Sequence, residues 1–497
     1  MHCSAQCSIR CSVTATNPLV TAAYYASMVH AASRPGFGCC SKIRPPTNRN
    51  PTNMEIIVIG AGLAGLTVAI ALQQAGHNVI VLESAPQITY IGAGIQVSSN
   101  SSRILRRLGV DKHIAPYCTE PVDLRMMRWQ DGQVLVERPL QQPALDEYKS
   151  PYWHIHRADL HRGLMARATE LGIAVRLDSR VQTVEPDVPA VTTKGGVRHT
   201  ADLVVASDGL HSVCREVVLG HTSPPSPTGQ MVYRVTVPTR KLAGIPQLED
   251  LVAVPRNNHW IGPHATVLSY LLQGVNEPLV NFVFTCDATT LPDGVNTQIG
   301  TADDVRARFR DWDPRLDAML AHVDEVLSWR LFTHHEIPRW AHAAHRLVLI
   351  GDAAHAMTPY LAQGAAMGIE DAAVLAGVLA QPDFAAVDRL PAALQLYEAL
   401  RIKRAARVAE ASITSRYFTQ MRDGPEQQAR DAWMLAHPGI QEGHINIRSR
   451  KEFLDELFGY DAYAALNEAL QTARAGSVAD VKAQVGTSSV SAIPVEA

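Results

Sequence analysis

Three glycines near residue 60 have the spacing of a phosphate-binding turn. Gly60, Gly62 and Gly65 form a GxGxxG pattern that directly follows the apolar run EIIVIG and opens a helical pattern. In such a turn the first glycine permits a tight bend, the second lets a pyrophosphate approach the backbone, and the third allows close packing of helix on strand. The N-terminus of the helix then presents unpaired N–H groups and a partial positive charge to the diphosphate.

A carboxylate completes this pattern at the end of the next apolar run. Glu83 ends HNVIVLE, 21 residues after Gly62, where its side chain can accept hydrogen bonds from both ribose hydroxyls. A free carboxylate at this position disfavours a phosphate on the ribose. The segment from 55 to 83 therefore predicts a β-α-β unit that binds FAD or NAD rather than NADP.

Two later segments carry further motifs. The run RLVLIGDAAHAMTPYLAQG combines a buried strand, Asp352 at its end, and a loop from Pro359 to Gly364 that opens a helix. Earlier in the chain, ASDGLHSVCRE contains Asp208, Gly209 and Arg215. In this order the three motifs resemble those of the class A FAD-dependent aromatic hydroxylases. The resemblance is closest to the salicylate hydroxylase-like branch, which includes fungal monooxygenases of secondary metabolism, and it extends from residue 54 to about residue 415.

The resemblance implies a set of contacts to FAD. In this family the aspartate at the position of Asp352 hydrogen-bonds the ribityl chain, and the helix starting at Gly364 points its positive end at the pyrimidine side of the flavin. The Asp-Gly motif at Asp208 is linked to FAD and nicotinamide binding. Arg157 resembles an arginine that contacts FAD, and residues 92–94 resemble a loop against the flavin ring, where a side chain would collide with the ring. The predicted cofactor-binding residues are Gly60, Gly62, Gly65, Glu83, Ala93, Gly94, Arg157, Asp208, Asp352, Gly364 and Ala365.

Residues that would touch a substrate are less well defined by pattern. In the strand-like run MVYRVTV, Tyr233 and Arg234 point to opposite faces, so only one of them faces a cavity. The resembled family places a substrate-orienting tyrosine or arginine in this neighbourhood, and an arginine suits a phenolate or carboxylate. The alternative is an ordinary exposed dipeptide. Arg215 either closes the Asp-Gly turn or touches substrate, so the candidate catalytic residues are Tyr233, Arg234 and Arg215. The histidines lack carboxylates at metal spacing, which predicts no metal site.

The reaction that the resemblance implies is hydroxylation of an aromatic substrate such as a phenol, a benzoate or a polyketide. FAD would be the bound cofactor, NADH or NADPH a transient co-substrate, and O2 the oxidant, acting through a C4a-hydroperoxyflavin. An FAD oxidase or dehydrogenase on the same fold is the alternative enzyme. A non-catalytic binding protein like the escort proteins of prenylated GTPases is a third hypothesis, which the intact Glu83, Asp352 and Gly364 disfavour.

The pattern of apolar and polar residues along the chain predicts an α/β fold with an inserted domain. Residues 54–220 and 346–420 are expected to form a discontinuous Rossmann-like FAD-binding domain, and residues 221–345 an inserted, mostly antiparallel β-sheet that binds substrate. Residues 421–497 are expected to form a C-terminal helical segment and tail. Helical spacing predicts helices at 159–171, 364–380, 393–415 and 450–473.

Composition limits the partners and the compartment. At 497 residues with 46% hydrophobic content, the chain is long enough for more than one domain. A net charge of −3 predicts no nucleic-acid partner, and no apolar run reaches the 18 residues of a membrane span. A small-molecule aromatic substrate is the expected partner, and a homodimer is left open. Five of the eight cysteines lie in the first 40 residues, which offers no disulfide framework and favours the cytoplasm.

The first 53 residues are predicted to lie outside the fold. They contain basic residues but no Asp or Glu, with many Ser, Thr and Ala, as in a mitochondrial transit peptide. Met54 directly precedes the first apolar strand, so translation could equally begin there. The segment is either a dispensable extension or a targeting signal that would place the protein in mitochondria.

Overall fold

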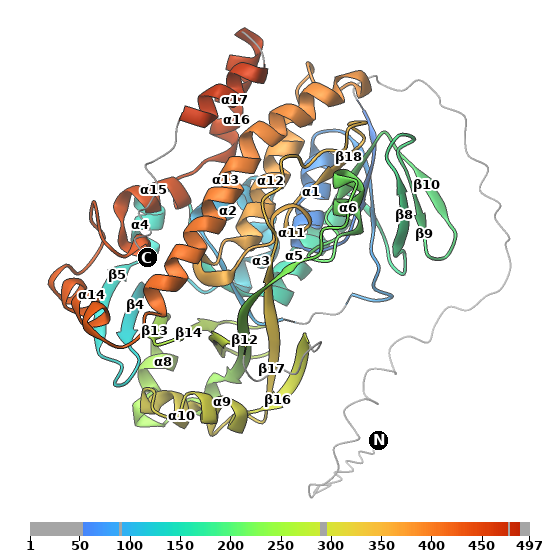
Figure 1. Cartoon of the computed structure of the whole chain (residues 1–497). Coiled ribbons are helices and arrows are strands. Elements are labelled where there is room, and N and C mark those ends of the chain that lie inside the picture. Colours follow the sequence, from blue (N-terminus) through green and yellow to red (C-terminus); the bar gives the residue numbers. More distant parts are fainter. Residues whose placement is uncertain (1–52, 89–91, 289–295, 476–477, 488–497) are drawn as a thin grey trace, which may run out of the picture. The chain divides into compact units, whose positions relative to one another are not determined.

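The computed structural model describes residues 53–88, 92–288, 296–475 and 478–487 (Figure 1). The predicted extension therefore lies, except for its last residue, outside the described residues. Within these four ranges, no helix combines the length and the apolar character needed to cross a bilayer.

A parallel five-stranded sheet forms the centre of the FAD-binding part. Its strand order is β18-β11-β1-β2-β7. The central strand β1 pairs with β2 on one side and β11 on the other, and β18, which comes from far along the chain, pairs with β11. A strand after residue 345 thus returns to the first sheet. The bounds are β1 Glu55–Ile59, β2 Asn78–Leu82, β7 Ala174–Arg176, β11 Leu203–Ala206 and β18 Leu347–Leu349.

Helices pack on this sheet through apolar and small residues. Helix α1 (Leu63–Gln74) contacts α12 (Gly364–Leu379), which in turn runs beside α13 (Leu390–Thr419), as Figure 1 shows. Helices α1 and α12 pack closely where Gly368 faces Ala64. A Cβ on Gly368 would lie only 2.9 Å from the Cβ of Ala64. Helix α5 (Arg157–Glu170) also contacts α1. The predicted helices at 159–171, 364–380 and 393–415 therefore correspond to α5, α12 and α13.

The second large sheet has eight strands in the order β16-β17-β12-β15-β14-β13-β4-β5. One of its faces packs on helices α8 to α10 through an apolar cluster that includes Phe282, Phe284 and Phe309. Strands β4 and β5 belong to this sheet although they lie inside the range 54–220 that was predicted as FAD-binding. The bounds are β4 Asp123–Arg128, β5 Val134–Pro139, β12 Ser226–Pro238, β13 Asn257–Gly262, β14 Ala265–Leu272, β15 Leu279–Asp287, β16 Thr297–Thr301, β17 Glu325–Thr333, α8 Glu249–Ala253, α9 Ala302–Arg308 and α10 Pro314–Leu320.

Smaller elements connect the two sheets and end the chain. Strands β3 (Gly94–Val97) and β6 (Trp153–His156) form an antiparallel pair, and β8 to β10 form a separate three-stranded sheet. The helix expected at 450–473 is two helices, because α15 ends at Phe458 with Gly459 as its C-cap. The Asp461 carboxylate then accepts from the backbone N–H of Tyr463 at the start of α16. The remaining bounds are β8 Val181–Glu185, β9 Ala190–Thr193, β10 Arg198–Thr200, α2 Ser99–Arg107, α6 Val213–Leu219, α14 Pro425–Ala436, α15 Lys451–Phe458, α16 Ala462–Ala475 and α17 Val478–Thr487.

Candidate active site

The turn between β1 and α1 has the geometry that its glycines require. Gly60 has a φ of +96°, and a Cβ there would lie 2.6 Å from the carbonyl oxygen of Ser207. A Cβ on Gly65 would overlap the carbonyl oxygen of Gly60, so this glycine serves packing, as predicted. Nothing lies within 4 Å of a Cβ on Gly62, and no side chain caps the start of α1. Open space above Gly62 and an uncapped helix N-terminus together form a place for an anion.

Two carboxylates border a cavity of about 270 Å³ beside this turn. Glu83 accepts hydrogen bonds from the backbone N–H of Ala61 (2.7 Å) and of Ala85 (2.8 Å), so it also ties the turn to the end of β2. Asp208 accepts from the Ser212 hydroxyl (2.6 Å) and from the backbone N–H of Cys214 (3.2 Å), which fixes the start of α6. Both acids therefore hold the backbone that surrounds this cavity.

A second uncapped helix N-terminus lies at α12. Strand β18 leads through Gly351 to Asp352, then through the loop at Pro359 to Gly364. No side chain caps α12. The buried Asp371 carboxylate accepts from the backbone N–H of Gly351 (2.9 Å), which fixes the strand end that carries Asp352. The Asp352 side chain is exposed to the main cavity.

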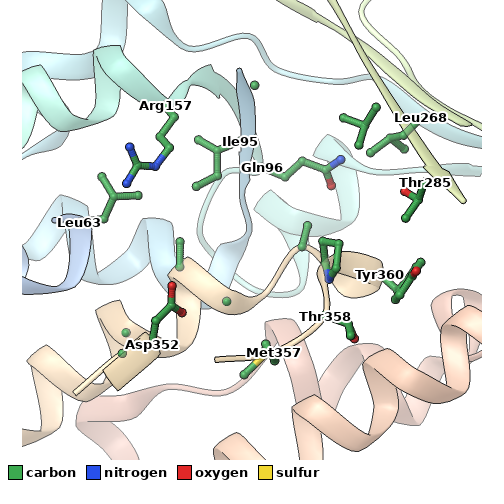
Figure 2. Close-up of a pocket in the computed structure, with 18 of the residues that line it drawn as sticks. Leu63, Ile95, Gln96, Arg157, Leu268, Thr285, Asp352, Met357, Thr358 and Tyr360 are labelled. Carbon is green, nitrogen blue, oxygen red and sulfur yellow. The ribbon is translucent and has the colours of Figure 1, made fainter. Parts of the chain in front are cut away.

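The main cavity, of about 410 Å³, joins the two helix N-termini to the eight-stranded sheet. Figure 2 shows Arg157 and Asp352 at one end, Leu268 and Thr285 at the other, and Gln96 between them. Burial lowers the pKa of Arg157, while the charge of Asp352 acts in the opposite direction, so the two side chains attract each other across this end. The volume lies within the range of about 300 to 1,000 Å³ that is usual for small-molecule sites.

The residues at the first end fit FAD. Two uncapped helix N-termini would receive the diphosphate and the pyrimidine edge, and Glu83 and Asp352 would accept from ribose and ribityl hydroxyls. Most of the predicted cofactor residues border one of the two cavities; these are Gly60, Gly62, Glu83, Gly94, Arg157, Asp208, Asp352, Gly364 and Ala365. Gly65 and Ala93 line neither cavity. Ala93 acts through its backbone, because its carbonyl accepts from the N–H of Arg157 at 3.0 Å.

The eight-stranded sheet forms the other wall of the main cavity. Alternate residues of β14 face the cavity and pair with residues of β15 that also face it, namely Thr266 with Thr285 and Leu268 with Val283. Tyr270, the next in this alternation, lies against Gly94, and a Cβ on Gly94 would lie 2.5 Å from its ring. The resemblance implied that Gly94 is small because of the flavin, whereas in the structure the Tyr270 ring already excludes a side chain there.

Of the three candidate catalytic residues, Arg234 alone lines the cavity. Its Nη1 donates to the carbonyl oxygen of Gly94 (2.9 Å), and its Nε is buried without a hydrogen bond to any described residue. Tyr233 points to the opposite face and is buried in the apolar cluster of the sheet. The Arg215 guanidinium donates to the carbonyl oxygens of Ala354 (2.7 Å) and His335 (2.8 Å), and it closes the Asp-Gly segment onto the strand end after β18.

Several residues that line the cavity were not predicted. The alternation of ATVLSYLL could have identified the face of β14 that carries Thr266, Leu268 and Tyr270, since every second residue of a strand shares a face. His259 on β13 and Arg448, which follows α14, also line the cavity. No local signal distinguishes Arg448 from its arginine-rich neighbours in the sequence INIRSRK.

The part of the chain that the structure describes contains no metal-binding cluster and no disulfide. No group of three His, Cys, Asp or Glu side chains there could hold a metal ion. The described cysteines, Cys118, Cys214 and Cys286, are unpaired. Burial raises the pKa of the Cys118 thiol to about 12 and that of Cys286 to about 11, so neither is a thiolate at neutral pH.

The chain is similar to known FAD-dependent proteins over most of its length. The family model described as an FAD binding domain matches residues 53–412. The chain is 36% identical over 420 residues to the FAD-dependent monooxygenase OpS4 of Beauveria bassiana, covering 84% of this chain and 97% of that protein. It is 35% identical over 382 residues to 3-amino-4-hydroxybenzoate 2-monooxygenase PtmB3 of Streptomyces platensis, covering 76% and 92%.

Solved structures share the fold. A salicylate hydroxylase substrate complex superimposes with a TM-score of 0.68 at 23% identity, covering 89% of this chain and 100% of that one. The fold, the GxGxxG turn, the segment from Asp352 to Gly364 and these relatives define a flavin-dependent oxygenase class. The chain belongs to the FAD-binding-domain family and is an FAD-dependent monooxygenase.

Proposed function

We propose that this monooxygenase hydroxylates an aromatic substrate held between the flavin end of the main cavity and the sheet wall. The observation that carries the proposal is the continuity of that cavity from Asp352 and Gly364 to Leu268 and Thr285. A planar ring placed there would lie beside the loop that opens α12. The relative from Streptomyces platensis is named for an aminohydroxybenzoate, which is an aromatic compound.

The protein supplies position and electrostatics rather than an acid–base pair. FAD, when bound, would activate O2, which provides the oxygen atom, with electrons from NADH or NADPH. The uncapped N-terminus of α12 would stabilise negative charge on the reduced flavin. The apolar side chains of Leu268 and Val283 exclude water from the substrate side, and Arg234, which lines the cavity, orients a polar ring substituent by its positive charge.

The wider setting follows from composition. We infer a cytoplasmic protein whose partners are small molecules, because the described cysteines are unpaired and the net charge is only −3. The nicotinamide would dock transiently, since the sequence contains a single GxGxxG unit for a resident dinucleotide.

The test is a substrate screen with the purified, yellow holoenzyme. Phenols and benzoates would be scored for acceleration of NADH or NADPH oxidation, with product mass checked for one added oxygen atom. We expect at least one aromatic compound to give both signals together. Stoichiometric hydrogen peroxide without any oxygenated product would instead identify the oxidase alternative and would overturn the proposal.

A further inference from the structure

Two arginines without acidic partners, the partly buried Arg448 and the buried Arg138, lie near the sheet end of the main cavity. Arg448 lies in a short 3-10 helix, Ile447–Ser449, and lines the cavity. Arg138 lies on β5, is 4% exposed, and does not reach the cavity surface. Neither guanidinium forms an ion pair with a carboxylate of the described residues. Each carries a fixed positive charge without an acidic neighbour to offset it.

The guanidinium of Arg448 has unused donors. Its Nη1 donates to the carbonyl oxygen of Tyr360 (2.6 Å), and its Nη2 lies 3.4 Å from Nε2 of His259. Its Nε is buried and has no hydrogen-bond partner in the described chain. A guanidinium has five N–H donors, so besides the buried Nε–H one N–H on Nη1 and one on Nη2 remain for a ligand in the cavity that Arg448 lines. Tyr360 stands beside Thr285 in Figure 2, at the end away from Arg157.

The surroundings of Arg448 are positive or neutral. Burial, and after it the charge of Arg448, lower the pKa of Arg138 to about 10, and burial also lowers the pKa of Arg448. Both arginines stay protonated at neutral pH. Burial and the two arginines hold the pKa of His259 well below its usual range, so its imidazole is neutral. Tyr152 is the other ionisable residue whose charge would influence the pKa of both arginines. Its hydroxyl donates a hydrogen bond to Oε1 of Gln96. An uncompensated buried cation costs several kcal/mol unless an anion joins it.

A purely structural role for Arg448 explains less of how Arg448 and Arg138 are placed. The bond from Arg448 to the Tyr360 carbonyl does attach the C-terminal segment to the loop before α12. A neutral amide would make the same bond, however, and Arg138 takes no part in it. Other buried arginines of the described chain have either a carboxylate or an acceptor for each guanidinium nitrogen. Arg401 contacts Glu370 at 2.6 Å and Asp371 at 2.8 Å. Arg215 donates from Nε, Nη1 and Nη2 to the Ser223 hydroxyl and to the carbonyl oxygens of Ala354 and His335. Arg448 and Arg138 have no carboxylate partner, and the Nε of each has no acceptor in the described chain.

We propose that Arg448, supported by the charge of Arg138 and flanked by the neutral His259, binds the carboxylate of an aromatic substrate at the sheet end of the cavity. The planar fork of a guanidinium matches the two oxygens of a carboxylate. The inference rests on the proposed function and narrows its substrate class to aromatic carboxylic acids. It also assigns a binding role to a residue beyond 412, outside the matched FAD-binding domain.

The experiment measures ligand binding without turnover. Benzoate, salicylate and 2,4-dihydroxybenzoate would each be titrated into oxidised holoenzyme at pH 7.5, beside the matching amide, and Kd read from the change in the flavin spectrum. We expect wild type to bind each acid that perturbs the spectrum about tenfold or more tightly than its amide, as a charge-assisted pair requires. Each amide keeps the ring and any phenol group, so binding through a phenolate would give no preference for the acid.

Variants assign the preference to Arg448. We expect Arg448→Gln to reduce the acid-to-amide preference to about twofold or less, and Arg448→Lys to retain part of it because the charge stays and the fork is lost. Arg450→Gln is the matched control, since Arg450 lies two residues away, does not line the cavity and donates to the carbonyl of His444. This control should keep the wild-type preference. FAD content and the melting temperature of each variant establish that it is folded.

Three results would overturn the inference: equal binding of acid and amide by wild type, an undiminished preference in folded Arg448→Gln, or no response to any of the three acids at millimolar concentration. A different result would contradict the proposed function: a holoenzyme that transfers oxygen to none of the aromatic compounds in the broader substrate screen. A monooxygenase that acts on neutral phenols would therefore retain the proposed function and lose this inference.

Discussion

At the scale of single residues, the two carboxylates predicted to hold FAD differ in what else they do. Glu83 accepts from the backbone N–H groups of Ala61 and Ala85 and so supports the turn itself. Asp352 is exposed to the main cavity, and no described side chain forms an ion pair with it. The Asp352 side chain, which lies at the cofactor end, therefore forms no ion pair that would compete with hydrogen bonds to FAD.

This difference predicts separable variants. Asp352→Ala should weaken FAD binding by roughly tenfold to a hundredfold, the cost of about 1 to 3 kcal/mol for buried hydroxyls left without a partner. The melting temperature of the apoprotein should not change. Glu83→Ala should weaken FAD binding and also lower the apoprotein melting temperature, because two backbone N–H groups lose their acceptor. Fluorescence titration of apoprotein with FAD and calorimetry would measure both effects; full FAD affinity in Asp352→Ala would contradict the assignment.

A buried histidine gives a prediction about pH. His154 is fully buried between Tyr152 and Tyr270, and neither ring nitrogen has a hydrogen-bond partner in the described structure. Burial lowers its pKa from 6.5 to about 3. Between these values the unfolded chain takes up a proton and the native protein does not, so the free energy of unfolding falls as pH decreases below 6.5.

His154→Phe should remove this part of the acid sensitivity, because it keeps an aromatic ring and breaks no side-chain hydrogen bond. From pH 7.5 to 5.0, the variant should lose roughly 2 kcal/mol less unfolding free energy than wild type, at about 1.4 kcal/mol per pH unit below 6.5. Urea denaturation of both proteins with saturating FAD would measure the two differences. Identical pH dependence in the two proteins would mean that His154 is protonated in the native state.

At the scale of elements, the β1-α1 turn and the start of α12 could be predicted because each is a local pattern. Glycine spacing, a terminal acid and helical periodicity all lie within about thirty residues, so the sequence contains the whole signal. The sheet wall was predictable as strands, but not in its pairing. Strands β4 and β5 join the eight-stranded sheet through parallel pairing of β4 with β13, a contact between distant segments that no local pattern encodes.

The glycine turn yields a matched pair of substitutions. Gly62→Ala should leave the unfolding midpoint unchanged, since a Cβ there meets nothing within 4 Å, but it should abolish FAD binding by filling the space for the diphosphate. Gly65→Ala should lower the unfolding midpoint of the apoprotein as well, because its Cβ would overlap the Gly60 carbonyl oxygen. Thermal melting and FAD titration of both variants separate packing from binding. A stable, FAD-binding Gly62→Ala variant would show that the diphosphate lies elsewhere.

At the scale of the whole molecule, the candidate site combines segments that are predictable with one that is not. The order of the three motifs predicted the cofactor end. The resemblance and the strand pattern left Tyr233 and Arg234 as alternatives, of which Arg234 lines the cavity. Arg448 reaches the cavity only because the C-terminal segment folds back onto β13 and the loop before α12. That return depends on side-chain contacts between residues more than eighty positions apart, which hydrophobic periodicity does not reveal.

A buried ionic network holds these distant segments together. The Glu370 carboxylate of α12 pairs with Arg401 (2.6 Å) and Arg404 (3.2 Å) of α13 and accepts from Asn100 of α2 (2.7 Å). Arg404 also donates to the carbonyl oxygen of Leu457 in α15 (3.0 Å). Burial alone would raise the pKa of Glu370, but the two arginines outweigh it and hold the pKa below the usual 4.5. The acid is therefore charged throughout the neutral range.

Replacing this acid tests whether the network holds the molecule together. Glu370→Gln keeps the shape but leaves two buried arginines short of a counter-charge, so it should lower the free energy of unfolding by about 3 to 5 kcal/mol at pH 7.5. Because the folded-state pKa is depressed, the difference from wild type should shrink as pH falls below about 4.5. Glu185→Gln is the control: its pair with Arg198 is exposed, and its unfolding midpoint should not move. Equal midpoints for the two variants would mean that packing, not this network, joins the C-terminal helices to the FAD-binding sheet.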